Sequence, residues 1–331
     1  MNGFKMRKVT VGIFLDASAA FDTVWTDALK FKLYQIGMAD SLLKMLSSFL
    51  DARSIKIWIN SLYSDSLELK AGTPQGSCLS PTLYLIYVND MPLQNTRNVS
   101  PSQYADDIGI WSTAFNLKET EESLTSALKE IEKWCQKWRV ILCPEKSKVV
   151  IFSRCPRHKE ESINLQLFGS KLQTSEEATF LGVIFDQRLT WEPQFKKMSE
   201  KGHARINFLK AISSLSSKNN PTLLINLYKA TVRSVFEYSS IAWISAAEVH
   251  LQKLQLIQNA AIRAALKVPI YIPDIVIHDA SGLPRTTEYL KDFSKSHLKR
   301  IQSNSPMVAK ALEDFQYVQW NKKHPSPLDV L

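Results

Sequence analysis

Three aspartates are the residues of this sequence whose type and spacing could carry chemistry. Asp16 follows the apolar run KVTVGIFL (8–15), and Asp106 and Asp107 lie between two apolar segments in QYADDIGIW (103–111). An aspartate pair alone indicates only a turn, because aspartate is a common turn residue. The flanking segments instead predict a tight hairpin whose acids emerge from a buried sheet. If this hairpin lies beside the strand that ends at Asp16, the side chains of Asp16 and Asp106 converge.

Converging carboxylates repel each other, by roughly 4 kcal/mol at about 4 Å and an effective dielectric constant near 20. A cation must therefore lie between them. The hard oxygen ligands favour Mg²⁺, which binds through one or two carboxylates together with substrate phosphates. Two such ions, about 3.5 to 4 Å apart, can activate a 3′-hydroxyl and stabilise the pyrophosphate that leaves in an in-line displacement. This is the chemistry of nucleotide polymerisation.

The hydrophobic pattern predicts the elements that position these acids. The expected strands are 8–15, 54–60 paired with 66–70 around the turn SLYSDS, 148–153, 163–168 and 179–185. The expected helices are 26–36, 40–50, 116–139, 191–215, 221–238, 247–267, 286–302 and 306–315. The loop AGTPQGSCLSP (71–81), punctuated by glycine and proline, leads into an apolar helix that begins at Pro81. The pattern changes from mixed α/β to all-α near residue 188, where we expect a domain boundary.

Composition limits the class of protein. The chain has 331 residues, 45% of them hydrophobic, which is enough for a sizeable core and about two domains. Its apolar runs are shorter than the roughly 20 residues of a membrane span, and no secretory signal is recognisable, so we expect an intracellular protein without a membrane partner. Four cysteines are too few for a disulfide framework.

Positive charge is concentrated in one stretch of the chain. The net charge is +9, and residues 201–300 carry 14 basic against 6 acidic side chains. Such a stretch predicts a docking surface for a polyanion. The alternative is a basic helical surface that serves only solubility.

Several segments, in this order, carry a resemblance to a known family. FLDASAAFDTVW (14–25), AGTPQGSCLSPTLY (71–84) and YADD (104–107) resemble the palm motifs of reverse transcriptases from non-LTR (LINE-type), jockey-like retrotransposons. CPEKSKVVIFSR (143–154) resembles the next motif, and FLGVIFDQRLTW (180–191) resembles the primer-grip motif. LYKATVRSVFEYSSIAW (227–243) and LQKLQLIQNAAIRAALKVP (251–269) resemble the helical thumb and the region after it.

The resemblance implies an α+β fold. Residues 1–187 would form a polymerase palm, an antiparallel sheet with helices on one face, and residues 188–331 an all-α, thumb-like region. The implied activity is that of an RNA-directed DNA polymerase, which transfers nucleotides from dNTPs onto a primer 3′-hydroxyl. The implied partners are an RNA template, a DNA primer and dNTPs, with two Mg²⁺ ions, or Mn²⁺, as cofactors. The sequence identifies no protein partner.

The resemblance also assigns roles to residues. Asp16 and Asp106 would be the principal metal ligands, and Asp107 would complete the catalytic triad. Phe21, Gln75, Gly76 and Lys146 would contact the nucleotide: Phe21 would exclude a ribose 2′-hydroxyl, and Lys146 would act as general acid or neutralise pyrophosphate. Leu181 and Gly182 would belong to the primer grip. The alternatives are a core phenylalanine at Phe21, a surface lysine at Lys146 and a strand bulge at Gly182.

Two other acids stand in these motifs without an expected catalytic role. Asp22 is expected to orient its own loop, and Asp90 to lie near the end of a helix.

The basic stretch would grip the template–primer backbone. The candidate nucleic-acid-binding residues are Lys201, Arg205, Lys210, Arg233, Lys253, Arg263 and Lys267.

Asp16 lies close to the start of the sequence, so we expect a chain truncated at its N-terminus, without the fingers and endonuclease of complete elements. A second hypothesis follows: a catalytically inactive relic that binds RNA or DNA through its basic helices. The resemblance implies action in the nucleus.

Overall fold

The computed structural model describes residues 8–93, 98–155, 163–215 and 220–306, together with Met6, Glu161 and Ala309. The chain divides into two compact units, one of residues 7–182 and the other formed chiefly by the chain from Val183 onward. Each unit is described by itself.

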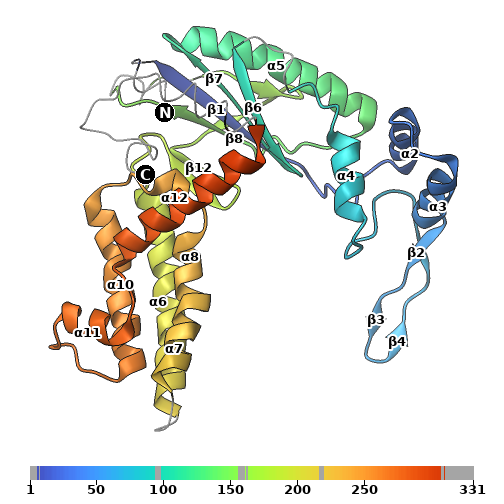
Figure 1. Ribbon diagram of the computed structural model, residues 1–331. Coiled ribbons are helices and arrows are strands. Elements are labelled where there is room, and N and C mark those ends of the chain that lie inside the picture. The colour runs from blue at the N-terminus through green and yellow to red at the C-terminus, as the bar shows by residue number, and fades with distance from the viewer. Residues whose placement is uncertain are drawn as a thin grey trace. The chain divides into compact units, whose positions relative to one another are not determined.

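The first unit contains a five-stranded sheet with strand order β11-β8-β1-β7-β6 (Figure 1). β1 (Val9–Asp16) lies at its centre, antiparallel to both β7 (Asp107–Ala114) and β8 (Lys148–Phe152). β6 (Val99–Tyr104) pairs with β7 in a hairpin, and the short edge strand β11 (Gln173–Thr174) runs parallel to β8. The expected antiparallel sheet is thus present, with one short parallel strand at its edge.

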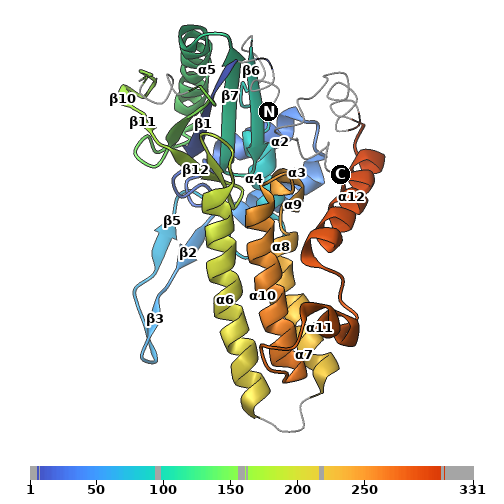
Figure 2. The ribbon, with the colours of Figure 1, turned by 90° about the vertical axis from the view of Figure 1, so that its left-hand side faces the viewer.

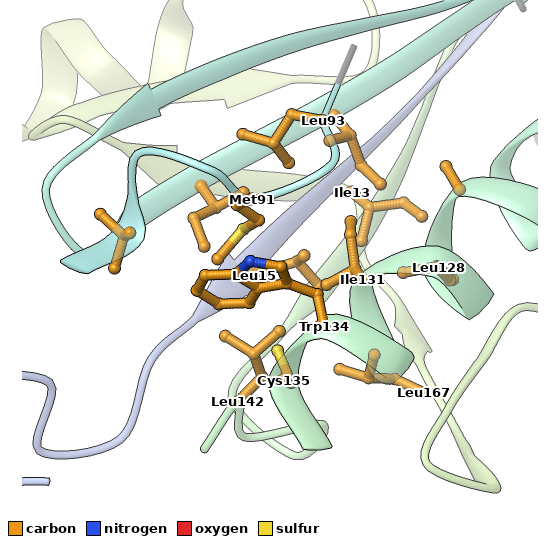
Figure 3. Close-up of a cluster of buried hydrophobic side chains, with 14 of the residues drawn as sticks. Ile13, Leu15, Met91, Leu93, Leu128, Ile131, Trp134, Cys135, Leu142 and Leu167 are labelled. Carbon is orange, nitrogen blue, oxygen red and sulfur yellow. The ribbon is translucent and has the colours of Figure 1, made fainter. Parts of the chain in front are cut away.

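The two faces of β1 differ in character. Val9, Val11, Ile13 and Leu15 are buried, whereas Asp16 lies on the opposite face because side chains alternate along a strand. α5 (Leu117–Trp138) packs on the buried face, and Figure 3 shows side chains of α5 next to those of β1. Burial of this apolar face holds β1 in place and leaves its last residue, Asp16, at the sheet's end.

Three further helices complete the core of this unit. These are α2 (Thr26–Gln35), α3 (Asp40–Leu50) and α4 (Ser80–Val88). Lys32 of α2 is 4% exposed, and its ammonium group lies 3.9 Å from the ring centroid of Trp138 and 2.5 Å from a carboxylate oxygen of Asp90. Asp90 also accepts a hydrogen bond from the Trp134 indole. This ion pair, with Lys32 buried and Asp90 half exposed, links α2 and α5 to the chain directly after α4.

A narrow arm leaves the rest of this unit between α3 and α4 (Figure 1). Its base is β2 (Arg53–Ile55) paired with β5 (Leu67–Leu69), and its tip is β3 (Trp58–Ile59) paired with β4 (Leu62–Tyr63). The prediction of a turn over SLYSDS (61–66) was wrong in its position. The chain reverses earlier, at Asn60 and Ser61, which both have positive φ (48° and 68°). Positive φ at both turn residues gives the twist that a two-residue hairpin needs.

The remaining short strands lie beyond β8. They are β9 (Gln166–Leu167), β10 (Ser170–Lys171) and β12 (Glu177–Phe180) in the first unit, and β13 (Val183–Asp186) in the second. The strand expected at 179–185 is interrupted at Leu181 and Gly182, which both have positive φ (48° and 77°).

The second unit is helical after β13. Its helices are α6 (Glu192–Leu215), α7 (Pro221–Tyr228), the π-helical segment η2 (Lys229–Arg233), α8 (Ser234–Glu237), α9 (Ser240–Trp243), α10 (Glu248–Leu266), α11 (Asp274–Ser281) and α12 (Thr286–Asn304). α6 and α10 lie side by side (Figure 2), and a Cβ added to Gly202 of α6 would lie 3.1 Å from a methyl group of Ile257. Most of the helix expected at 306–315 falls outside the described residues.

Candidate active site

The sheet brings two of the three aspartates into direct register. Asp16, the last residue of β1, is the cross-strand partner of Asp107, the first residue of β7. Directly opposed residues on neighbouring antiparallel strands have Cβ atoms about 4.5 to 5.5 Å apart on one face of the sheet. Burial, followed by the charges of Asp106 and Asp16, raises the pKa of Asp107. The carboxylate of Asp107 therefore lies within electrostatic range of both Asp16 and Asp106.

Asp106 occupies the turn before β7. Tyr104 and Asp107 are paired, so Ala105 and Asp106 form a two-residue turn, and Ala105 has the positive φ (53°) that such turns require. Burial, with a further contribution from Asp106, raises the pKa of the Tyr84 hydroxyl. The ring centroid of Tyr84 lies 4.8 Å from that of Phe21. Tyr84 therefore packs against Phe21 and is also affected by the negative charge of Asp106.

The strand on the other side of β1 supplies lysine. β1 and β8 are paired up to Phe14 opposite Lys148, and Lys146 lies in the turn that precedes β8. Lys146, Lys148, Asp16 and Asp107 line a cavity of about 130 Å³. Lys148, the first residue of β8, was not expected to belong to the site.

Ser147 holds this edge of the site together. The backbone N–H of Asp16 donates to the Ser147 hydroxyl (3.2 Å), which itself donates to the carbonyl of Cys143 (2.7 Å). The N–H of Cys143 donates in turn to the carbonyl of Asp16 (2.8 Å). Ser147 is fully buried, so this closed set of hydrogen bonds fixes the backbone of Asp16 relative to Lys146.

The loop 71–76 lies against the chain that follows β1. The N–H of Gly72 donates to the carbonyl of Val24 and the N–H of Thr73 to that of Phe21, both at 2.8 Å. Gly72 has φ of 89°, and an added Cβ would lie 2.8 Å from the backbone oxygen of Asp22. Only glycine fits this close approach. The loop that carries Gln75 is thus joined to Phe21 by a backbone hydrogen bond from Thr73.

The side chains of Asp22 and Arg53 make further hydrogen bonds with the loop 71–76. The Gln75 side-chain nitrogen lies 2.8 and 3.0 Å from the two carboxylate oxygens of Asp22. The Arg53 guanidinium donates to the carbonyls of Ala71 (2.9 Å) and Gly72 (2.6 Å). A second cavity, of about 610 Å³, is lined by Asp22, Arg53 and Gln75 among others. Sequence reasoning did not single out Arg53 and gave Asp22 only its own loop to orient.

The residue directly before the expected primer-grip residues, Phe180, makes an aromatic contact with β1. The ring of Phe180, directly before Leu181 and Gly182, lies 5.5 Å from that of Phe14 on β1. A Cβ added to Gly109 of β7 would lie 3.4 Å from the Phe180 ring, so glycine there leaves room for it. Phe14 is two residues before Asp16 and shares its face of β1.

The seven candidate nucleic-acid-binding residues of the second unit divide into two groups. Lys201, Arg205, Lys210, Lys253 and Lys267 are exposed. Arg233 instead pairs with Glu237 (3.1 Å) and Arg263 with Asp274 (2.6 Å), and the side chains of both arginines are 18% exposed. Binding a phosphate through either arginine would require breaking these internal ion pairs.

The arrangement of the acids bears on metal binding. No group of three or more histidine, cysteine, aspartate or glutamate side chains within the described ranges is close enough to hold a metal ion. Asp16 and Asp107 nevertheless offer hard oxygen ligands in register, and the pKa of Asp107 is raised first by burial and then by the neighbouring negative charges of Asp106 and Asp16, which a divalent cation would neutralise. The carboxylates of Asp16 and Asp107 are therefore suitable ligands for Mg²⁺.

The sheet, its paired strand-end acids and the flanking helices define a polymerase palm-like α+β fold. Residues 2–185 match the family model described as reverse transcriptase (RNA-dependent DNA polymerase). The chain belongs to the reverse transcriptase family.

Curated relatives agree with this family. The chain is 27% identical over 318 residues to the RNA-directed DNA polymerase from mobile element jockey of Drosophila funebris, covering 94% of this chain and 34% of that protein. It is 26% identical over 320 residues to the probable RNA-directed DNA polymerase from transposon BS of Drosophila melanogaster, covering 94% and 35%. The chain thus spans about a third of the length of these relatives. The predicted resemblance to LINE-type reverse transcriptases is confirmed.

Solved structures also give a match. Apo telomerase from Candida tropicalis is 14% identical, with a TM-score of 0.45, covering 88% of this chain and 48% of that one.

Across the residues that the structure describes, no helix combines the length and the apolar character of a membrane span.

Proposed function

We propose that the chain carries the polymerase site of an RNA-directed DNA polymerase, which adds nucleotides from dNTPs to the 3′-hydroxyl of a DNA primer paired with an RNA template. The observation that carries this proposal is the register of Asp16 with Asp107, next to the turn that holds Asp106. Membership of the reverse transcriptase family supports it. As in the family's elements, the site of action would be the nucleus.

Asp16, Asp106 and Asp107 would hold the catalytic ions, two Mg²⁺ or Mn²⁺. When bound, such ions activate the primer hydroxyl and stabilise the charge on the leaving pyrophosphate. The chain's own residues orient the substrates. Lys146 and Lys148 place positive charge on the cavity that Asp16 lines, where it can attract phosphate oxygens.

The nucleotide itself would lie against the loop 71–76 and Phe21. The backbone and the ring of Phe21 each have a partner. Its carbonyl accepts the N–H of Thr73, and its ring packs against the ring of Tyr84. A ring held in this way cannot move aside for a larger sugar, which supports discrimination against a ribose 2′-hydroxyl. Leu181 and Gly182, directly after Phe180, would contact the primer.

The second unit would bind the backbone of the template–primer duplex through its exposed lysines and Arg205. A chain that only binds nucleic acid through these residues is the alternative function, and the exposure of five basic side chains supports it equally. The acids of the first unit favour the polymerase.

Primer extension tests the proposal against this alternative. The purified chain is incubated with poly(rA)/oligo(dT), dTTP and Mg²⁺ or Mn²⁺, and duplex binding is measured in parallel. The proposal expects extended primer that disappears on chelation of the metal. Duplex binding with no extension under any metal would overturn the proposal and leave the binding function.

A further inference from the structure

The carboxylate of Asp22 and the side-chain amide of Gln75 form a bidentate contact between two segments far apart in the sequence. The amide nitrogen lies 2.8 Å from one carboxylate oxygen and 3.0 Å from the other. An ionised carboxylate can only accept hydrogen bonds, and only the nitrogen of a glutamine amide can donate them. Asp22 therefore fixes which way the amide is turned: the nitrogen faces Asp22, and the carbonyl oxygen faces away from it.

The backbone prepares this contact. Hydrogen bonds from Gly72 to Val24 and from Thr73 to Phe21 flank it, and Gly72 approaches the backbone of Asp22 so closely that a Cβ would not fit. The hydroxyl of Ser80, at the start of α4, donates to the carbonyl of Pro74 (2.6 Å). Because both backbones are already held, only the rotamer entropy of the two side chains is lost when they make this contact.

Asp22 is distinct from the cluster of catalytic candidates. The acids that raise the pKa of Asp107 are Asp106 and Asp16, and Asp22 does not contribute. Its carboxylate is instead engaged by Gln75, the residue expected to contact the incoming nucleotide.

We propose that Asp22 is a positioning residue for the nucleotide: it holds the Gln75 amide so that the carbonyl oxygen is presented to a hydrogen-bond donor on the incoming dNTP. The inference rests on the proposed function, because it takes Gln75 to be a nucleotide contact. It deepens that function by assigning Gln75 the role of acceptor. With Asp22 absent or able to donate, the amide can turn over and present its nitrogen instead.

The most direct variant is Asp22→Asn, which keeps the shape of the side chain but lets it donate as well as accept. Its expected effect is a rise in the dNTP KM of about tenfold, the size of one charge-assisted hydrogen bond, with little change in kcat and in Tm. The matched control is Asp65→Asn, the same change at an exposed acid of the arm, which should leave KM as in the wild type. An unchanged KM in Asp22→Asn would overturn the inference.

Swapping the carboxylate and the amide between positions 22 and 75 gives a second test. Gln75→Glu sets two carboxylates against each other and should raise KM further. The double variant Asp22→Asn with Gln75→Glu again pairs a donor with an acceptor-only group, now with the donor at position 22. It should bind dNTP better than Gln75→Glu alone while the Tm of the two variants stays the same, whereas a purely structural role for Asp22 would change KM and Tm together. A double variant that is no better than Gln75→Glu would contradict the inference.

Failure of the proposed function is distinguished from failure of this inference by the wild type. No incorporation by wild type would reject the polymerase, whatever the variants do. In that case the exchange of the Gln75 side-chain amide protons, followed by NMR, still tests the contact: they should exchange faster in Asp22→Asn than in wild type, and Asp65→Asn should not change them. Equal protection in all three proteins would overturn the positioning role without reference to catalysis.

Discussion

Asp16 and Asp107 face each other across the β1–β7 ladder, each at the end of its strand. The apolar residues next to them in the two strands, Leu15 before Asp16 and Ile108 after Asp107, are buried. The core therefore fixes the two acids at short range although they repel each other. Such repulsion strengthens the binding of cations at a polymerase site. In the metal-free protein the same repulsion lowers the stability of the fold.

The pKa shift of Asp107 predicts how stability depends on pH. Its carboxyl has a raised pKa in the folded protein, so its ionisation disfavours the folded state, and stability is lost as pH rises through the unfolded and folded values. Asp107→Asn should therefore raise the free energy of unfolding at pH 7 by roughly 0.2 to 1 kcal/mol, a range reduced for solvent screening. The gain should vanish at pH values below the ordinary aspartate range. Urea unfolding at several pH values measures it, and a gain that is equal at all of them would contradict the coupling.

The buried ion pair of Lys32 and Asp90 should contribute strongly to the stability of the first unit. Lys32→Ala removes the ion pair and the contact with Trp138, leaving Asp90 without its cation. Because Asp90 is half exposed, we expect a loss of about 2 to 3 kcal/mol, below the range for fully buried pairs. The control is Lys133→Ala, whose exposed pair with Glu130 should contribute less than about 0.5 kcal/mol. Equal losses in the two variants by urea unfolding would argue against the buried pair.

Gly202 determines how closely α6 approaches α10. A larger side chain must displace Ile257 and Phe236, both fully or nearly fully buried. Gly202→Leu should therefore destabilise the protein by about 1 to 3 kcal/mol, as overpacking of a core does. Ala204→Leu adds a similar volume to the exposed side of the same helix and should be close to neutral. Thermal unfolding compares the two, and a neutral Gly202→Leu would show that the helices do not pack as described.

Exposure separates the basic residues of the second unit by function. Replacing Lys201 and Lys210 by alanine should weaken nucleic-acid binding and reduce the slope of log affinity against log salt by about 1 for each lysine that contacts a phosphate. Arg263→Ala should act on stability instead, because its guanidinium pairs with Asp274 and donates to the carbonyl of Ile272. Binding titrations at several salt concentrations test this, and a slope that Arg263→Ala alters more than the lysine changes would contradict it.

The sequence predicted those parts of the site that depend on local pattern. The apolar run before Asp16 and the segments around YADD predict β1 and the β6–β7 hairpin, because alternation and turn chemistry are local properties. The turn at Asn60 and Ser61 was missed, since neither position has the glycine that usually marks a two-residue hairpin.

The local sequence pattern could not predict contacts between segments that are far apart in the chain. Asp22 and Gln75 are 53 positions apart, and nothing in their neighbours indicates that they meet. The pairing of Arg263 with Asp274 likewise depends on how α11 returns toward α10. The four-residue spacing of Arg233 and Glu237 could have suggested their ion pair.

Single-nucleotide incorporation by acid variants tests the central claim most directly. Wild type, Asp16→Ala, Asp106→Ala and the surface control Asp65→Ala are compared on one RNA–DNA primer-template with Mg²⁺, after circular dichroism has shown that all four are folded. If the cluster around Asp16 is a polymerase site, wild type and Asp65→Ala extend the primer, and the other two variants lose extension while they still bind the duplex. Extension that survives in Asp16→Ala and Asp106→Ala would contradict this account.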